Sequence, residues 1–220
     1  MSDLSGKSYL VVGASGALGS RIARGLHERG AALTVTGRSA EALAAFDGAH
    51  VVTADLREPD AGRAVVAAAV EAHGRLDGVV IAAGVVAFGP LAEIDDDTVD
   101  DLVLIDFLAP LRVMRAALPV LDAGGVILGI SAVVAEKPLP NMAVYSAVKA
   151  ATAALFTAAR TEARRRKIRV VDVRPPHTET GLADRAIAGQ APKLPAGLDP
   201  DAVAERIIAT LLGDETELAS

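Results

Sequence analysis

The chain lacks the residue types on which several classes of protein depend. Its 220 residues include no cysteine, which excludes disulfide bonds, thiolate catalysis and zinc–thiolate sites. A formal net charge of −6 leaves no basic excess for a nucleic-acid or anionic-membrane partner. The most apolar stretch, 79–92, is shorter than a membrane span and is broken by glycine and proline. The N-terminal stretch carries an acidic residue and reaches a glycine-rich turn too early for a signal peptide, so we expect a soluble, cytoplasmic protein.

The chain does contain a regular alternation of β-branched and alanine-rich segments. Hydrophobic residues make up 51% of it, and no repeat or linker divides it, so we expect a single domain over 1–220. Short apolar runs between helical patterns indicate βαβ units around a parallel sheet. We expect strands at 8–13, 32–37, 50–54, 78–83, 125–131 and 169–174, and helices at 17–29, 40–46, 59–73, 95–120, 143–167 and 200–212.

One long irregular stretch, 175–198, follows the last of these strands and is rich in proline and glycine. Long loops in compact domains are usually lids or binding loops. Open α/β sheets bind their ligands beyond the carboxyl ends of the strands, where this stretch begins. We therefore predict that 175–198 is a substrate-binding loop.

A glycine-rich turn joins the first strand to the first helix. Glycine allows a tight turn and lets a pyrophosphate approach backbone N–H groups at a helix N-terminus. The turn is therefore a candidate dinucleotide site. An ordinary turn glycine with close helix–strand packing is the alternative explanation. The candidate ligands are Gly13, Ser15, Gly16, Ala17, Leu18 and Gly19.

A second motif, "YSAVK", contains one of the two tyrosines in the chain. Tyr145 and Lys149 lie one helical turn apart, so the phenol and the ammonium share a helix face. The glycine turn resembles the T-G-x-x-x-G-x-G turn of the short-chain dehydrogenase/reductase superfamily, with Val12 and Ala17 at two altered positions. That superfamily pairs its turn with Y-x-x-x-K, and the resemblance covers nearly the whole chain.

The resemblance implies the fold and the domain type. We expect a Rossmann-like doubly wound α/β domain that binds a dinucleotide and acts as an oxidoreductase, with about six parallel strands in the order 3-2-1-4-5-6. The superfamily usually adds a seventh strand after the last helix. The C-terminal stretch 211–220 shows no such strand, so we expect the seventh to be missing.

The resemblance also implies a role for the tyrosine–lysine pair. Tyr145 would protonate the carbonyl oxygen of the substrate while hydride arrives from the nicotinamide. A free phenol has a pKa near 10, so a neighbouring cation must lower it for acid–base work near neutral pH. Lys149 is placed to do this, and it could also hold the ribose hydroxyls.

Two other catalytic positions of the superfamily do not match cleanly. The position of the catalytic serine falls on Ala132, with Ser131 as the neighbouring hydroxyl. Ser131 would be catalytic if the strand end bulges, and otherwise would bond nearby backbone. The asparagine position falls on Asp106, whose main-chain carbonyl would hold a proton-relay water. Pro110 lacks an N–H and would free that carbonyl, whereas a charged Asp106 would raise the pKa of Tyr145 and oppose Lys149.

The end of the second strand indicates which nicotinamide cofactor is used. An NAD enzyme would place an acidic residue there for the ribose hydroxyls, but this chain has Arg38 followed by Ser39. An arginine would pair with a 2′-phosphate, and Ser15 could add a hydroxyl donor. We therefore expect NADP(H), with NAD(H) less favoured. A solvated arginine at a helix start is the alternative.

The remaining cofactor contacts are implied by the resemblance. "TADLRE" resembles the adenine-side motif, although Asp55 would also suit a helix cap with Glu58. "IAAG" keeps the small residues that let a cofactor pass, and "RPPHTET" matches the segment that bonds the nicotinamide. His177 is interpreted as a loop residue. The positions implied are Asp55, Leu56, Ala83, Gly84, Pro175, Thr178 and Thr180.

These features predict an NADP(H)-dependent oxidoreductase that transfers hydride between the nicotinamide and a small carbonyl or alcohol, with Tyr145 and Lys149 as its acid–base pair. The alternative is an NADP(H)-binding protein with weak or no catalysis, because Ala132 and Asp106 replace two catalytic residues. No metal site is expected, since the acidic run 95–101 suits a helix start. A homodimer through helices 95–120 and 143–167 is expected.

Overall fold

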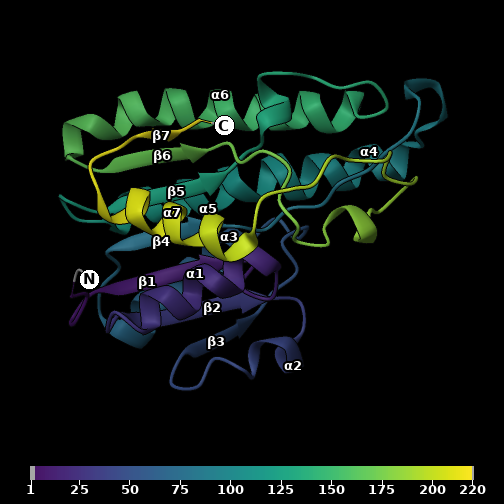
Figure 1. Ribbon diagram of the computed structural model, residues 1–220. Helices are drawn as coiled ribbons and strands as arrows, with labels where there is room; N and C mark the ends of the chain where they lie inside the picture. The colour runs from purple at the N-terminus through teal and green to yellow at the C-terminus, as the bar shows by residue number, and fades with distance from the viewer. Residues whose placement is uncertain (1–2, 220) are drawn as a thin grey trace.

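The computed structural model describes residues 3–219, which contain one parallel sheet with helices on both faces (Figure 1). The strand order is β3-β2-β1-β4-β5-β6-β7, with every pairing parallel. The predicted doubly wound α/β fold and its order 3-2-1-4-5-6 are therefore confirmed. The strands are β1 Ser8–Val12, β2 Ala32–Gly37, β3 His50–Thr53, β4 Gly78–Ile81, β5 Val126–Ile130, β6 Arg169–Val173 and β7 Glu217–Leu218.

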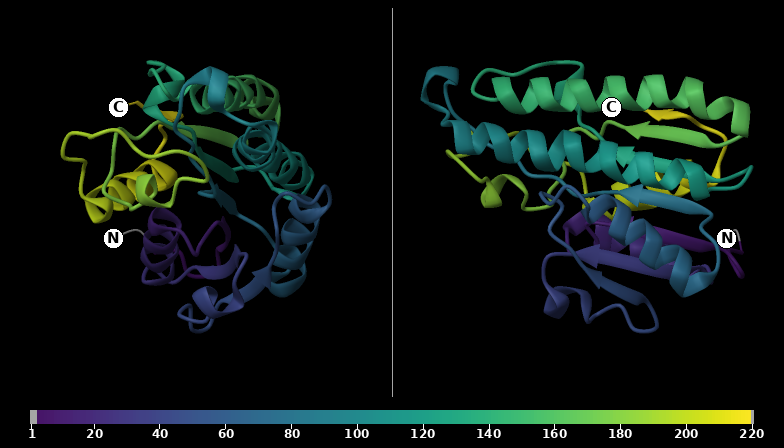
Figure 2. Two further views of the ribbon diagram at one scale, coloured as in Figure 1. Left: turned by 90° about the vertical axis from the view of Figure 1, so that its right-hand side faces the viewer. Right: turned by 180° about the vertical axis from the view of Figure 1, so that it is seen from behind.

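The helices form two layers. Figure 2 shows α1 and α7 against one face of the sheet, and α3, α5 and α6 against the other. No helix in residues 3–219 has the length and apolarity needed to cross a membrane. The helices are α1 Ala17–His27, α2 Ala40–Leu43, α3 Ala61–His73, α4 Asp96–Val103, α5 Ala109–Val120, α6 Ala143–Ala163 and α7 Pro200–Leu212.

Each central strand buries side chains on both faces, which explains its continuous apolar sequence. In β1, Val11 packs into the cluster that contains Ile22 of α1 and Ile207 of α7. Leu10 and Val12 point the opposite way, into the cluster beneath α3 and α5. Successive side chains of a strand alternate between the two faces of its sheet, so one strand serves both cores.

The expectation that a seventh strand is missing is wrong. β7 pairs with β6 through Asp172 opposite Glu217 and Val173 opposite Leu218. It has two residues, too few for a sequence pattern. Its side-chain anchor is Glu217, whose carboxylate lies 2.7 Å from Arg160 and 2.9 Å from Arg174. The short strand therefore depends on ion pairs as well as on its backbone ladder.

The helix expected at 95–120 is continuous but not uniform. α4 begins after Asp95, whose side chain accepts a hydrogen bond from the Thr98 amide at 2.7 Å. Residues 104–108 then form a π-helical turn before α5 begins. Pro110 sits just after this turn and has no N–H for the carbonyl of Asp106. The widened turn is how the helix accommodates the proline.

The loop 175–198, hereafter the lid, is closed at its base and joined to the domain at its tip. At the base, the Glu179 amide donates to the Leu198 carbonyl at 3.0 Å, which joins the two arms of the lid to each other. At its tip, the Ile187 amide donates to the Val86 carbonyl at 2.8 Å, and the Phe88 amide donates to the Ala188 carbonyl at 2.9 Å. The tip bonds join the lid to the segment that follows β4, across the mouth of the cleft described below.

Gly189 makes the tip contact possible. Its φ is +69°, and a Cβ there would lie 1.8 Å from the Phe88 carbonyl oxygen. We predict that Gly189→Ala breaks the two tip bonds, so that the amides of Ile187 and Phe88 exchange with solvent much faster, as measured by hydrogen–deuterium exchange. Gly181→Ala is the matched control, because Gly181 also has a positive φ but faces only the flexible end of Arg185. Equal protection in both variants would contradict this role for Gly189.

Candidate active site

A cleft of about 1110 Å³ lies beyond the carboxyl ends of the strands. β1 pairs with β2 on one side and with β4 on the other, so the chain builds the sheet outward from β1 first in one direction and then in the opposite one. This reversal of strand order opens a crevice, and open α/β sheets bind ligands at such a point. The lid forms the opposite wall of the cleft, from Pro175 to Ala196.

The glycine turn forms one end of the cleft and has the shape of a phosphate cradle. Gly13 has φ +85°, and a Cβ at Gly19 would lie 2.2 Å from the Gly13 carbonyl oxygen. The N-terminus of α1 has no side-chain cap and no acidic residue in its first turn, so its amides can receive an anion. Gly19 packs against the turn and does not line the cleft. The residues of the turn that line it are Gly13, Ser15, Gly16, Ala17 and Leu18.

The end of β2 brings a cation and a hydroxyl to this cradle. Arg38 is exposed and lines the cleft. A Cβ at Gly37 would lie 2.7 Å from the Ser15 hydroxyl, so the two segments touch. A guanidinium beside a hydroxyl fits a phosphate monoester. Ser39 has a different place: its side chain accepts a hydrogen bond from the Ala42 amide at 3.3 Å and caps α2.

The segment after β3 only partly matches its expected role. Leu56 lines the cleft. The Asp55 carboxylate accepts a hydrogen bond from the Arg57 amide at 3.0 Å and closes a local turn. The N-cap position of α3 belongs to Asp60, so the expectation that Asp55 caps this helix is wrong. The cause is the turn itself, which delays the helix by several residues.

Tyr145 and Lys149 lie together on α6, at the floor of the cleft. Both are buried, and the Lys149 ammonium lies 5.7 Å from the centre of the Tyr145 ring. The ammonium also donates to the Ile130 carbonyl at 3.3 Å, which ties α6 to the end of β5. A phenol and a cation at this separation interact strongly because water is largely excluded. The pair can therefore exchange a proton with a bound oxygen.

Asp106 forms a buried ion pair with Lys149. One carboxylate oxygen lies 3.0 Å from the ammonium and accepts a 3.3 Å hydrogen bond from the Val85 amide. The other oxygen has no partner among the described residues. Gly84 gives the pair room, because a Cβ there would lie 2.9 Å from Asp106 and 3.4 Å from Lys149. Ala83 and Gly84 line the cleft directly above it.

The main-chain carbonyl of Asp106 accepts a 2.6 Å hydrogen bond from the Thr152 hydroxyl. Pro110 leaves this carbonyl without the usual helical donor, as its sequence position predicts. Thr152 was not among the predicted site residues. Its position three residues after Lys149, on the same face of α6, is the signal that could have identified it.

Burial and charge act in opposite directions on this group of residues. Burial raises the pKa of Tyr145, Lys149 lowers it and Asp106 raises it again, and the resulting pKa lies above the usual value. Burial lowers the pKa of Lys149, but Asp106, Tyr145 and Asp172 together more than offset this effect, so the pKa is raised and the ammonium is stabilised. Burial raises the pKa of Asp106 as well. Lys149 and Asp106 therefore act on the pKa of Tyr145 in the expected, opposite directions, and burial is the larger effect that holds this pKa above its usual value.

Ser131 lines the cleft, but its hydroxyl is bonded elsewhere. The hydroxyl donates to the Asp172 carboxylate at 2.6 Å, and Ser131 is only 2% exposed. Asp172 is itself fully buried and pairs with Arg174 at 2.9 Å. The main partner is thus a carboxylate and not the nearby backbone expected for a structural Ser131, although the Val173 carbonyl also lies 3.5 Å from the hydroxyl. Ala132 carries no hydroxyl in its place.

The lid supplies the remaining predicted positions. Pro175, Thr178 and Thr180 all line the cleft. The Thr178 hydroxyl donates to the Pro176 carbonyl at 2.9 Å, and the Thr180 hydroxyl accepts from the Leu182 amide at 3.3 Å. These bonds fix the segment that leaves β6. His177 also lines the cleft, beside Glu179 at 3.5 Å.

The walls around Tyr145 are apolar, and most of them were not predicted. They come from the segment after β4, the segment after β5, the start of α6 and the lid. Each segment contributes one to three residues, so no single stretch of sequence signals the pocket. The apolar residues that line it include Val86, Phe88, Val133, Val134, Leu139, Met142, Leu182, Ile187 and Leu194.

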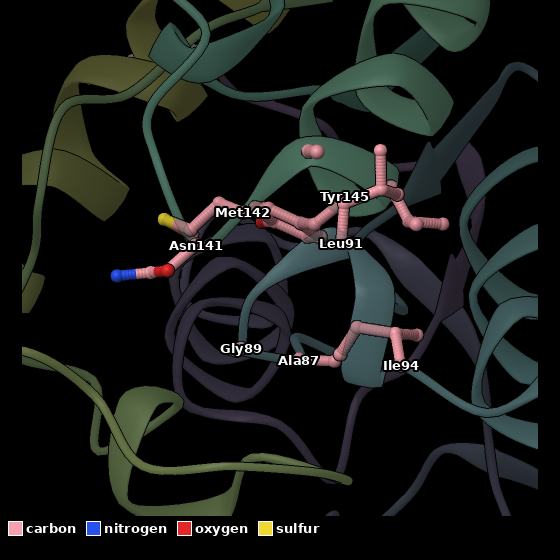
Figure 3. A pocket seen from close by; sticks show the side chains of 9 residues that line it. Ala87, Gly89, Leu91, Ile94, Asn141, Met142 and Tyr145 are labelled. Carbon is pink, nitrogen blue, oxygen red and sulfur yellow. The ribbon is translucent and has the colours of Figure 1, made fainter.

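A second, much smaller cavity of about 10 Å³ adjoins Tyr145 (Figure 3). A cavity of this size holds about one water molecule. It is therefore too small for an organic substrate, which leaves the large cleft as the candidate binding site. Figure 3 shows the side chains around it, which include Leu91, Ile94, Asn141, Met142 and Tyr145.

Comparison with known proteins identifies the family. The family model described as short chain dehydrogenase matches residues 7–191. An uncharacterised oxidoreductase of Methylorubrum extorquens is 36% identical over 208 residues, which cover 90% of this chain and 83% of that protein.

Solved structures with the same fold include a short-chain dehydrogenase from Burkholderia cenocepacia in complex with NADP, with a TM-score of 0.85 and 28% identity, covering 98% of this chain and 96% of the other. Another is an alcohol dehydrogenase from Thermococcus sibiricus complexed with 5-hydroxy-NADP, with a TM-score of 0.86 and 25% identity over 97% and 95% of the two chains. With the glycine turn, the Tyr145–Lys149 pair and the family match in agreement, the chain belongs to the short-chain dehydrogenase/reductase family of oxidoreductases.

Proposed function

We propose that this protein is an NADP(H)-dependent oxidoreductase that interconverts a carbonyl compound and its alcohol. One observation carries the proposal: Tyr145 and Lys149 lie in the same cleft as the glycine cradle and Arg38. The cleft is large enough for a dinucleotide and a small substrate side by side. The apolar walls around Tyr145 favour a substrate that is largely apolar next to its reacting carbon.

Each residue has a defined task in this proposal. The α1 N-terminus and the Gly13 turn hold the pyrophosphate, and Arg38 with Ser15 holds a 2′-phosphate. Lys149 holds the ribose. The bound nicotinamide supplies or accepts the hydride. Tyr145 donates its proton to the carbonyl oxygen in reduction and receives it back in oxidation, which is general acid–base catalysis.

Two relatives in structure support the choice of phosphate-bearing cofactor. The Burkholderia cenocepacia enzyme is in complex with NADP, and the Thermococcus sibiricus enzyme is complexed with 5-hydroxy-NADP. In this chain the support is Arg38, which stands where a carboxylate would otherwise bond the ribose. A negative charge there would repel a 2′-phosphate, whereas a guanidinium attracts it.

The cofactor assignment leads to a test by fluorescence titration. NADPH is expected to bind at least about tenfold more tightly than NADH, since a charge-assisted contact contributes about 1.5–3 kcal/mol. Arg38→Asp should erase or reverse this preference. Arg24→Asp is the matched control, because it makes the same charge change on an exposed face of α1 outside the cleft. Equal dissociation constants for both cofactors in the unmodified protein would rule the assignment out.

The assembly follows from the exposed surface of α6. Its outward face carries small side chains at Ala147, Ala151, Ala154, Thr157 and Ala158, which allow close packing of a second helix. We expect a homodimer through α6 and the α4–α5 helix, with a mass of about twice 22.4 kDa by light scattering. Ala154→Arg should give monomers, whereas Ala202→Arg on exposed α7 should not. A tetramer at micromolar concentration would contradict this assembly.

The catalytic role is tested by following NADPH oxidation against a panel of ketones, aldehydes and quinones. Tyr145→Phe removes one oxygen, so the fold and NADPH binding should persist while turnover falls by about 10²–10⁴. Lys149→Ala should lose turnover and also weaken NADPH binding. Ser131→Ala should change turnover little, because its hydroxyl is bonded to Asp172. If Tyr145→Phe is as active as wild type on a confirmed substrate, the alternative of a cofactor-binding protein replaces this mechanism.

A further inference from the structure

The Asp106 carboxylate is buried against Lys149, and the acid–base roles of Tyr145 and Lys149 do not by themselves explain why a carboxylate stands there. The carboxylate is completely buried, and Lys149 is the one cation that contacts it among residues 3–219. A buried carboxylate is costly unless it is paired and hydrogen-bonded. One carboxylate oxygen is both paired and hydrogen-bonded, because it lies 3.0 Å from the Lys149 ammonium and accepts a hydrogen bond from the Val85 amide. Asp106 and Lys149 are therefore best described as one ion pair.

The ion pair changes the field that Tyr145 experiences. A lone ammonium 5.7 Å from the ring centre would strongly favour the phenolate. An ammonium whose charge is balanced 3.0 Å away by a carboxylate presents a dipole, and its effect on the phenol falls off faster with distance. Burial is the main cause that holds the pKa of Tyr145 above its usual value, and Asp106 adds to it by opposing Lys149, as this geometry requires.

Other charged groups lie farther from the phenol or face solvent. Asp172 of β6 acts on Lys149 and is itself held by Arg174 and Ser131. The lid brings four titratable side chains to the same cleft, and all are at least partly exposed, so solvent screens them. These are His177, Glu179, Asp184 and Arg185.

We propose that Asp106 is a positioning residue that balances the charge of Lys149 and so keeps Tyr145 a neutral phenol near neutral pH. The site then reduces carbonyl compounds at neutral pH and oxidises alcohols with NADP⁺ only in alkaline solution. In reduction, hydride from NADPH forms the new C–H bond, the C=O π bond breaks, and the Tyr145 proton forms the new O–H bond. NADPH is oxidised to NADP⁺, and solvent returns a proton to the phenolate. This inference rests on the proposed function.

The composition of the chain allows a direct test that needs no substrate. Tyr9 and Tyr145 are its two tyrosines, and it has no tryptophan. In a Tyr9→Phe background, ultraviolet absorbance of tyrosinate therefore reports the ionisation of Tyr145 alone. Asp106→Asn keeps the shape but removes the negative charge, so Tyr145 should ionise at a pH lower by about one unit. Circular dichroism at each pH establishes that the protein remains folded.

Asp101→Asn is the matched control. Asp101 lies on the same helical segment but forms a partly buried ion pair with Arg57 at 2.6 Å, away from Lys149, so its loss should leave the pH at which Tyr145 ionises unchanged. If Asp106→Asn also leaves the pH of Tyr145 ionisation unchanged, the inference is wrong. The Tyr145→Phe turnover result tests the proposed function separately. On a carbonyl that the protein reduces, the alkaline fall in kcat/KM should move to lower pH in Asp106→Asn and stay unmoved in Asp101→Asn.

A double variant covers the case in which Asp106→Asn does not fold. Asp106→Asn with Lys149→Met removes both charges and leaves no buried ion without a partner. If Asp106 balances Lys149, the two losses offset each other, and Tyr145 should titrate close to the Tyr9→Phe protein. If Asp106 carries no charge in the unmodified protein, only the cation is lost, and ionisation should move upward by about one pH unit or more. That upward shift would overturn the inference.

Discussion

The site depends on one steric constraint, the contact of three backbone segments with no side chain between them. A Cβ at Gly13 would lie 2.5 Å from the Ala83 amide nitrogen, and a Cβ at Gly19 would lie 2.2 Å from the Gly13 carbonyl oxygen. The end of β1, the start of α1 and the end of β4 therefore meet at van der Waals distance. This contact opens the cradle for a pyrophosphate and also sets where the chain goes after β4.

The same segment carries the constraint to the catalytic residues. Gly84, directly after the contact, leaves room for the Asp106–Lys149 ion pair, and the Val85 amide bonds the same carboxylate. Replacing a buried ion pair with apolar residues is often neutral or stabilising, so stability alone gives no reason to keep this one. The contact of Asp106 with Lys149, whose ammonium lies 5.7 Å from the Tyr145 ring centre, gives the proposed chemical reason. The π-helical turn before Pro110 is the local adjustment that presents both the side chain and the main-chain carbonyl of Asp106 to α6, where the carbonyl accepts a hydrogen bond from the Thr152 hydroxyl.

Patterns that are local in sequence predicted most of the fold and the two ends of the site. Alternating strands and helices, the glycine turn and the Tyr145–Lys149 spacing each lie within a short stretch, so periodicity and turn chemistry suffice. Features that depend on tertiary contacts were missed. β7 has two residues and is held by Arg160 and Arg174 from elsewhere in the chain. The Ser131 hydroxyl is turned by Asp172, 41 residues away, which no local pattern encodes.

In the proposed mechanism, the two departures from the family pattern, Ala132 and Asp106, both affect the proton that Tyr145 donates to the substrate. A hydroxyl at position 132 would give the substrate oxygen a second donor, but Ala132 has none and the Ser131 hydroxyl is bonded to Asp172. Tyr145 is then the donor on which the substrate oxygen depends. A phenol that ionised readily would leave that oxygen without a proton. In this proposal, the Asp106 carboxylate balances Lys149 and holds the phenol neutral. It thereby compensates for the missing serine hydroxyl, because it keeps the one remaining proton donor protonated.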